Sequence, residues 1–197
     1  MICLDIKVNG DLVCRAGIAN ASILSSILGA SVGADHPADL RISGMCELPE
    51  ERVAHVYWAE GRSLSSGDHI TFTLIDCEDA TKPAEIVPTD SPEYLEEQAK
   101  LEEVEGAFVR DEAPAERKWP SLAFDCRINN EHKAIAVLAP DEEHILCSVT
   151  WDKWRPEQCR VFVRSFGSST KTGIEHQTAW VRATLLMGDC LEVRAFA

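Results

Sequence analysis

The feature that most constrains the fold is an internal repeat with an offset of about 120 residues. The segment Leu4-Asp5-Ile6-Lys7-Val8-Asn9-Gly10 matches Phe124-Asp125-Cys126-Arg127-Ile128-Asn129-Asn130. Because all matches occur in the same order, the sequence predicts two copies of one module. The other matching segments are 23–27 with 145–149, 40–42 with 161–163, Trp58 with Trp180, and 64–72 with 185–193.

The repeat divides the chain into three parts: an N-terminal copy over 1–76, a connector over 77–119 and a C-terminal copy over 120–197. Each copy is close to the smallest size at which one hydrophobic core holds a domain together. We therefore expect the copies to pack against each other or against the connector.

Each copy begins with alternating apolar and polar residues, such as Leu4, Ile6 and Val8, which is typical of a half-buried strand. Asn9-Gly10 then favours a tight hairpin turn. The apolar residues within 23–28 and 145–149 predict a short helix, and later segments predict two or three more strands. The expected fold class is α+β: two tandem ββα(β)ββ modules, each with its helix across one sheet face.

This pattern resembles the β-grasp fold of ubiquitin-like and sulfur-carrier proteins. The resemblance rests on the Val8-Asn9-Gly10 hairpin, the short Ile-Leu helix, and the L-x-x-G-D-x-I motif over 64–70. Carriers of that family need a flexible C-terminal Gly-Gly, whereas this sequence ends in Ala195-Phe196-Ala197. The resemblance therefore implies the β-grasp fold without conjugation or sulfur carriage.

The connector is predicted to contain an acidic amphipathic helix at about residues 92–105. Ser91 is a suitable N-cap, Pro92 fits the first helical position, and Tyr94 begins an apolar side. Two interpretations remain open. The apolar side docks on a module, or the helix binds a partner through acidic residues, of which we select Glu96, Glu97 and Glu103.

Charge narrows the class of partner. The net charge is −14, and most of it comes from the connector, in which acidic residues far outnumber basic ones. Nucleic-acid binding requires positive charge to neutralise phosphates, so we expect no nucleic-acid partner. A basic protein partner fits this charge better.

The eight cysteines include no C-x-x-C pair, and no cysteine of one copy aligns with a cysteine of the other. We therefore expect reduced core cysteines, with no disulfide and no metal site. The sequence also has no apolar run of membrane-spanning length and does not begin like a signal peptide, which predicts a cytoplasmic protein without membrane association.

Known catalytic motifs are absent: the sequence has no P-loop, no G-x-G-x-x-G and no H-E-x-x-H. His144 with Cys147 and the pair Asp68-His69 lack full counterparts in the other copy, so we interpret them as structural. We predict no catalytic residues, no cofactor and no metal. His55 and His176, near Trp58 and Trp180, are the place where a ligand site between the copies would be sought.

Trp151, Trp154 and Arg155 have no counterparts in the first copy. Tryptophan and arginine are enriched at binding hot spots, so we select these three residues, together with the connector glutamates, as candidate partner contacts.

The leading hypothesis is a non-catalytic cytosolic protein-interaction module, such as an immunity-type inhibitor or an adaptor that binds a basic protein partner. The alternative is a small-molecule-binding or enzymatic protein with its site between the two repeats. A third possibility is an assembly role through exposed sheet edges.

Overall fold

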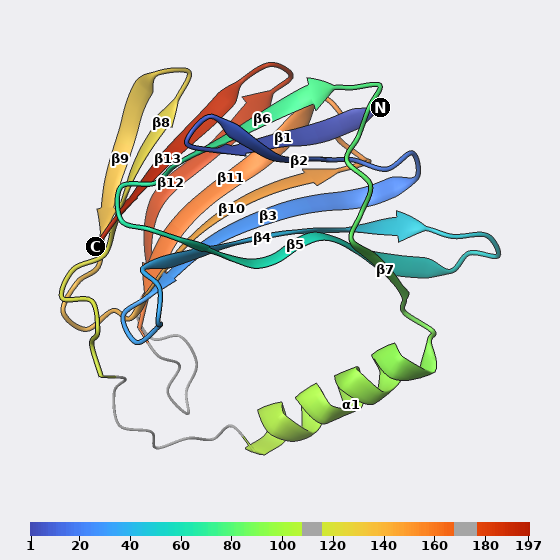
Figure 1. Cartoon of the computed structure of the whole chain (residues 1–197), viewed down its shortest axis with the longest axis horizontal. Coiled ribbons are helices and arrows are strands. Elements are labelled where there is room, and N and C mark those ends of the chain that lie inside the picture. The colour runs from blue at the N-terminus through green and yellow to red at the C-terminus, as the bar shows by residue number, and fades with distance from the viewer. Residues whose placement is uncertain (108–115, 168–176) are drawn as a thin grey trace.

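The computed structural model describes residues 1–107, 116–167 and 177–197, without the side chains of 97 and 101–107. This part forms two antiparallel β-sheets and one helix (Figure 1). The first sheet has six strands in the order β2-β1-β6-β13-β8-β9. Their bounds are Asp11–Ala16 (β2), Ile2–Val8 (β1), His69–Asp76 (β6), Cys190–Phe196 (β13), Ala123–Ile128 (β8) and Glu131–Val137 (β9).

The second sheet has seven strands in the order β12-β11-β10-β3-β4-β5-β7. It lies behind the six-stranded sheet in the view of Figure 1. The bounds are Gln177–Leu186 (β12), Gln158–Phe166 (β11), His144–Asp152 (β10), Ala21–Ser31 (β3), Ala38–Glu47 (β4), Val53–Leu64 (β5) and Glu85–Pro88 (β7).

The expected α+β class with β-grasp-like modules is wrong, because the described residues are mostly strand and form two antiparallel sheets. The predicted helices at 23–28 and 145–149 are parts of strands β3 and β10. Burial in both strands alternates with period two: Leu24 and Leu28 point inward, and Ile27 between them points outward. Residues four apart lie on one side of a helix and also of a strand, so the apolar spacing did not distinguish the two.

The repeat is visible in the strand pairing. In the first copy β1 pairs with β2 and β6, and in the second copy β8 pairs with β9 and β13. The copies join where β6 pairs with β13 and where β3 pairs with β10. Leu24 pairs with Trp151 and Ala30 pairs with Ile145, so a pseudo-two-fold axis relates Leu24 to Ile145. Both are buried, whereas Leu146 is not, and the predicted alignment of 23–27 with 145–149 is therefore wrong by one residue. Each sheet therefore runs through both copies.

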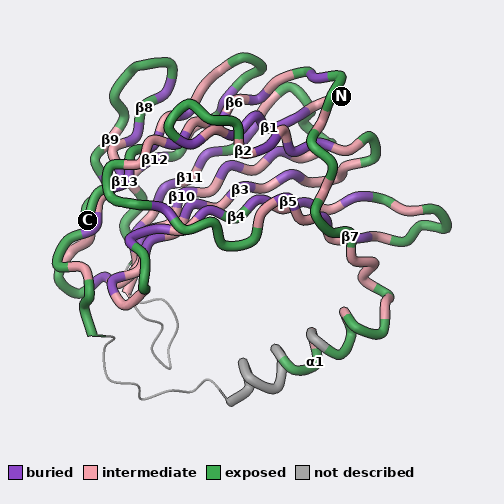
Figure 2. Tube along the Cα trace, in the orientation of Figure 1, coloured by how far each residue is buried: buried purple, intermediate pink, exposed green. Residues whose placement is uncertain are grey.

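The core is one continuous cluster of buried apolar side chains between the sheets, drawn from both copies (Figure 2). Phe72 from the first copy and Phe124 from the second are its largest fully buried members. Burying side chains of this size contributes roughly 1.5–3 kcal/mol each, so the two copies stabilise one another through the shared core.

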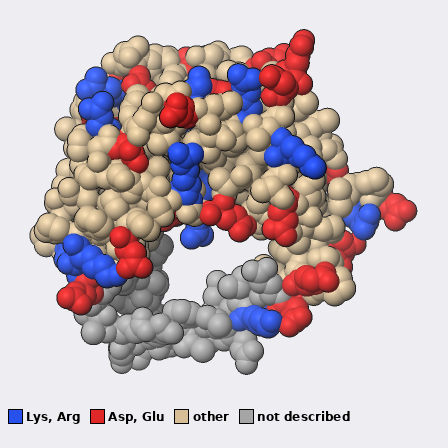
Figure 3. All heavy atoms as spheres, viewed as in Figure 1, with Lys and Arg blue, Asp and Glu red and all other residues tan. Residues whose placement is uncertain are grey.

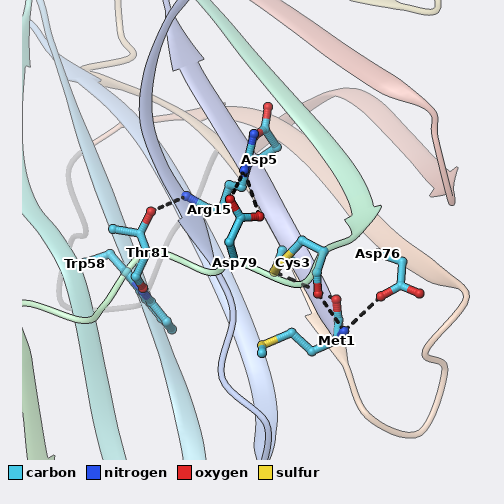
Figure 4. The surroundings of a disulfide bond; sticks show 9 residues. Met1, Cys3, Asp5, Arg15, Trp58, Asp76, Asp79 and Thr81 are labelled. Atoms are coloured by element: carbon cyan, nitrogen blue, oxygen red, sulfur yellow. Dashed lines mark hydrogen bonds and ion pairs between the residues drawn. A yellow bond between two sulfur atoms is a disulfide. The ribbon is translucent and has the colours of Figure 1, made fainter.

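Residues 77–84 cross from the six-stranded sheet to the seven-stranded sheet, and we call them the crossing segment (Figure 4). A disulfide between Cys3 and Cys77 fixes its beginning. The expectation that the chain has no disulfide is therefore wrong for these two residues, although the other described cysteines are free. Alignment of the copies could not detect the bond, because Cys77 belongs to the connector, which has no counterpart in the repeat.

Two further contacts hold the crossing segment, through Arg15 and Trp58. Arg15 on β2 forms ion pairs with Asp5 at 3.1 Å and with Asp79 at 3.0 Å. The indole Nε1 of Trp58 donates to the carbonyl oxygen of Thr81 at 2.8 Å (Figure 4). Since β7 follows directly, these contacts determine where the chain leaves the sandwich.

The connector helix α1 spans Pro92–Ala107, close to the predicted range. It begins as expected, because the Ser91 hydroxyl accepts the Tyr94 N–H at 3.2 Å. The prediction of an amphipathic linking helix is wrong: apolar residues do not concentrate along one side, and Leu95 is 56% exposed. The sequence also places Phe108 on the apolar side of this helix, and that residue lies outside the described residues. Within the described part, no helix is both long and apolar enough to cross a membrane.

Candidate protein-interaction surface

One end of the seven-stranded sheet gathers several of the residues selected from the sequence. A row of paired residues crosses this sheet from Asp152 on β10 through Ile23 and Met45 to His55 on β5. His55 Nε2 lies 3.1 Å from the hydroxyl of Tyr94 in the first turn of α1. The β10–β11 turn and the start of α1 therefore lie at the same end of the sheet, about 14 Å apart at the usual strand spacing.

The candidate contact residues in and beside the β10–β11 turn, which are Trp151, Trp154 and Arg155, differ in their exposure to solvent. Trp151 points into the core, is 6% exposed, and donates its Nε1 to the carbonyl oxygen of Pro156 at 3.0 Å. Trp154 is 70% exposed, and the Nζ of Lys153 lies 5.5 Å from its ring centroid. Arg155 is also exposed. Trp154 and Arg155 are thus accessible to a partner, whereas Trp151 supports the turn from inside.

The three candidate glutamates all belong to α1. Glu96 is exposed and pairs with Lys100 at 2.8 Å, one helical turn later. The side chains of Glu97 and Glu103 lie outside the described part of the chain.

The same end of the sheet carries exposed carboxylates from the end of β4 and the β4–β5 turn, from the loop before α1, and from α1 itself. We call this surface the acidic end. Its members are Glu47, Glu50, Glu51, Asp90, Glu93 and Glu96. In Figure 3 acidic side chains are frequent on the right-hand side, where α1 leaves the sheet.

Half of these carboxylates are paired with a base. Lys153 pairs with Glu47, Arg52 pairs with Asp90 at 3.6 Å, and Lys100 pairs with Glu96. Among the described residues, Glu50, Glu51 and Glu93 have no basic partner within ion-pair distance. The unpaired carboxylates give this surface a local negative charge.

Glu50 and Glu51 form the tip of the β4–β5 turn in an unusual conformation. Their φ angles are 63° and 59°, in the left-handed region that favours glycine and asparagine. The turn is closed by the Leu48 N–H, which donates to the carbonyl oxygen of Arg52 at 2.9 Å. Backbone strain at non-glycine residues concentrates at functional sites, which directs attention to this pair.

Sequence analysis did not select Glu50 and Glu51. The available signal was the segment Leu48-Pro49-Glu50-Glu51-Arg52 between two strand-like runs, because a turn there would have to place two acids at its tip. A hollow of about 380 Å³ lies beside the turn, lined by Glu47, Leu48, Glu51, Arg52 and Val53.

Contacts at its first turn fix the start of α1. The rings of Tyr94 and His55 stack with centroids 5.3 Å apart, in addition to their hydrogen bond. Leu95 in the helix and Ile86 on β7 remain 56% and 45% exposed. The helix therefore starts from a fixed point and presents both an apolar side chain and carboxylates to solvent.

The buried thiols are poorly suited to nucleophilic chemistry. Burial raises the pKa of Cys14, Cys126 and Cys159 to about 12, which keeps them protonated at neutral pH. Cys147 is buried on the inner side of β10, and burial raises its pKa well above the ordinary value. His144 lies three residues away on the strand and therefore faces the opposite side, so the two do not form a catalytic pair.

The described residues contain no group of three or more His, Cys, Asp or Glu side chains arranged to hold a metal ion. Trp180 donates its Nε1 to the Ser165 hydroxyl at 2.8 Å, while His55 contacts Tyr94. His176 lies outside the described residues. The structure thus does not place His55 beside Trp180 in a site between the copies.

A polar hollow of about 260 Å³ does lie where the copies join in the six-stranded sheet. His69 of the first copy is 3.1 Å from Glu192 of the second. The other lining residues are Asp125, Arg127 and Arg194.

No family model, curated protein or solved structure matches this chain. Functional inference therefore rests on the geometry and charge of the surfaces described above.

Proposed function

We propose that this chain is a non-catalytic protein-interaction module that binds a basic protein partner through its acidic end. The observation that carries the proposal is the pair Glu50 and Glu51, held in left-handed conformations at a turn tip. Asn-Gly would form such a turn with less strain, and the chain uses asparagine with glycine at Asn9-Gly10. The presence of two glutamates at a strained tip favours a role for their carboxylates.

Charge and exposed apolar groups support the choice of partner. Unpaired carboxylates attract a basic surface and accelerate its association. Affinity also requires apolar anchors, and Trp154 and Leu95 are exposed at this end of the sheet. A basic partner that contacts both the β4–β5 turn and α1 would use charges and anchors together.

Two versions of the proposal share this contact. An immunity-type inhibitor would cover a basic enzyme and abolish its activity, whereas an adaptor would leave the partner active. Both versions place the protein in the cytosol, as the sequence predicts, and cell fractionation tests that location.

The test is capture of partners by the tagged full-length chain from native lysate, at low and at high salt, read by mass spectrometry. The informative variant is Glu50→Asn with Glu51→Gly, which removes both carboxylates and relieves the backbone. A matched control is Asp11→Asn with Glu131→Gln, which removes two exposed carboxylates at hairpins of the other sheet.

We expect one stoichiometric basic partner that is weakened by salt, lost in the turn variant and retained in the control. Capture that is equal in the turn variant and the control would contradict the acidic end as the binding surface. Absence of any basic partner at low salt would contradict the proposed function as a whole.

The hollow between the copies favours a second candidate function, the binding of a small polar molecule. It combines His69 and Glu192 with Arg127 and Arg194, groups that suit a ligand with both acidic and basic parts. A thermal-shift screen with amino acids and small dicarboxylates tests it. Stabilisation that disappears in Arg194→Ala would support this function, and no shift with any compound would reject it.

A further inference from the structure

The outer face of the seven-stranded sheet carries positive charge near the edge that β12 and β11 form. Arg160 and Arg164 on β11 and Arg182 on β12 surround Phe162. We call these four residues the arginine face. The guanidinium carbons of Arg182 and Arg164 lie 5.0 Å and 5.7 Å from the centroid of the Phe162 ring, which is within cation–π range.

Strand register explains why these side chains gather on one face. Phe162 pairs with Arg182 on one side and with Ser148 on the other, while Arg160 and Arg164 are two residues before and after it on β11. Val161 and Val163, which alternate with them, are buried in the core. The arginine face is therefore directed to solvent by the period of the strand.

The arginines are incompletely satisfied. Arg160 pairs with Asp152 at 3.3 Å, but within the described residues no carboxylate pairs with Arg164 or Arg182. The Nε of Arg164 is buried and has no hydrogen-bond partner there. A carboxylate brought to this face would form ion pairs with the guanidinium groups of Arg164 and Arg182 that the described part of the free chain lacks.

The face is also hollowed around Phe162. Two adjoining hollows of about 390 Å³ and 360 Å³ share Arg160, Phe162 and Arg182. Hydroxyl groups of Ser148, Thr150 and Thr184 complete their rims. Such a surface accepts acidic side chains at its edges and an apolar side chain over the ring.

The chain itself contains a segment of complementary chemistry. Helix α1 presents Glu93, Glu96 and the exposed Leu95 to solvent. Its own copy holds the start of α1 at β5, through Tyr94 and His55. Four strand spacings separate β5 from β11 in the sheet order, which is about 19 Å, so the first turn of α1 stays away from its own arginine face.

We propose that the arginine face binds helix α1 of a second copy of this chain. Glu93 and Glu96, which lie three residues apart on the same side of the helix, then pair with Arg164 and Arg182 of the other copy. Because the two contacting surfaces differ, the contact is heterologous. Repeating it from copy to copy gives a closed dimer or ring only if the rotation between copies brings the last copy back into contact with the first. The contact goes beyond the proposed function and would compete with a basic partner for α1.

The test is sedimentation velocity of the full chain over a wide range of concentration, at low and at high salt. The variants are Arg182→Glu, the matched control Arg62→Glu at an exposed position of β5, and the charge swap Arg182→Glu with Glu96→Lys. Thermal unfolding of each variant verifies that the fold is retained. The variant Glu50→Asn with Glu51→Gly leaves the residues of α1 as they are. It therefore tests partner binding and not self-association, and either proposal can fail without the other.

We expect self-association that weakens with salt, is lost in Arg182→Glu, persists in Arg62→Glu and returns at least in part with the charge swap. A monomer at every concentration at low salt would overturn the proposal. Equal losses in Arg182→Glu and Arg62→Glu would also overturn it, because they would show a response to net charge alone.

Discussion

Asn9 donates its side-chain amide to Asp68 Oδ1 at 2.8 Å, and the repeat reproduces this bond between Asn129 and Asp189 at 2.7 Å. Asn9 also accepts the N–H of His69 at 2.9 Å. Each bond ties the first hairpin of a copy to the beginning of its last strand. The residues that the sequence marks only as turn formers thus join segments about 60 residues apart.

These bonds predict a pH dependence of stability. The hydrogen bond from Asn9 lowers the pKa of Asp68, and the one from Asn129 lowers the pKa of Asp189. A carboxyl group with a lowered pKa in the folded state stabilises the fold above its unfolded pKa of about 4, and this contribution disappears as pH falls through the folded value. Calorimetry should show that Asp68→Asn with Asp189→Asn lowers Tm at pH 7.

The difference in Tm between this variant and the parent should shrink below about pH 4, where the parent carboxylates become protonated. A difference that stays constant with pH would show that the bonds act without the carboxylate charge. Asp11→Asn, an exposed acid at the first hairpin, is the control and should leave Tm almost unchanged.

Relief of the β4–β5 turn should stabilise the protein. Glu50→Asn with Glu51→Gly places favoured residues at left-handed positions, and we expect the free energy of unfolding to rise by about 1 kcal/mol. Urea unfolding measures the change. Loss of stability, or an increase accompanied by unchanged partner binding, would remove the argument that strain is retained for function.

The disulfide should contribute strongly to stability. Cys3 and Cys77 are separated by 74 residues, and closing a loop of that length restricts the unfolded chain by about 4 kcal/mol. Reduction, or Cys3→Ala with Cys77→Ala, should lower the urea midpoint accordingly. Cys190→Ala serves as the comparison, and a similar loss in that variant would argue against a specific role for the bond.

Thiol labelling should be selective in the native state. Of the described free cysteines, five are buried and Cys190 is partly exposed. Because thiolate is the reactive form and burial also blocks access, a thiol reagent should react rapidly with Cys190 alone. Cys190→Ser should abolish the fast phase, and a remaining fast phase would show that a buried cysteine becomes exposed by opening of the sandwich.

Local patterns anticipated the parts of the fold that local contacts determine. The alternation of Leu4, Ile6 and Val8, the Asn9-Gly10 turn and the Ser91 cap each depend on neighbours in sequence. Strands β3 and β10 depend instead on one another, at a distance of about 120 residues. Their spacing of apolar residues fits a helix as well as a strand, so only pairing with the partner strand determines that these segments are strands.

The candidate surface was predictable to a similar extent. Trp154, Arg155 and Glu96 were selected by residue type, and the structure exposes them at one end of a sheet. Trp151 was grouped with them, although two-residue alternation on β10 turns it inward. The segment around Glu50 and Glu51 did signal a turn, but their positive φ could not be predicted, because it is a property of the backbone path and not of the residue type.

Since β6 pairs with β13 and β3 pairs with β10, the two copies stand in the relation of subunits in a homodimer that has been fused into one chain. Neither half has a finished sheet of its own: separation would turn the most central strands into exposed edges. Deleting one copy would therefore remove half of both sheets at once, and the remaining copy would keep strands without partners on the side where the other copy had been.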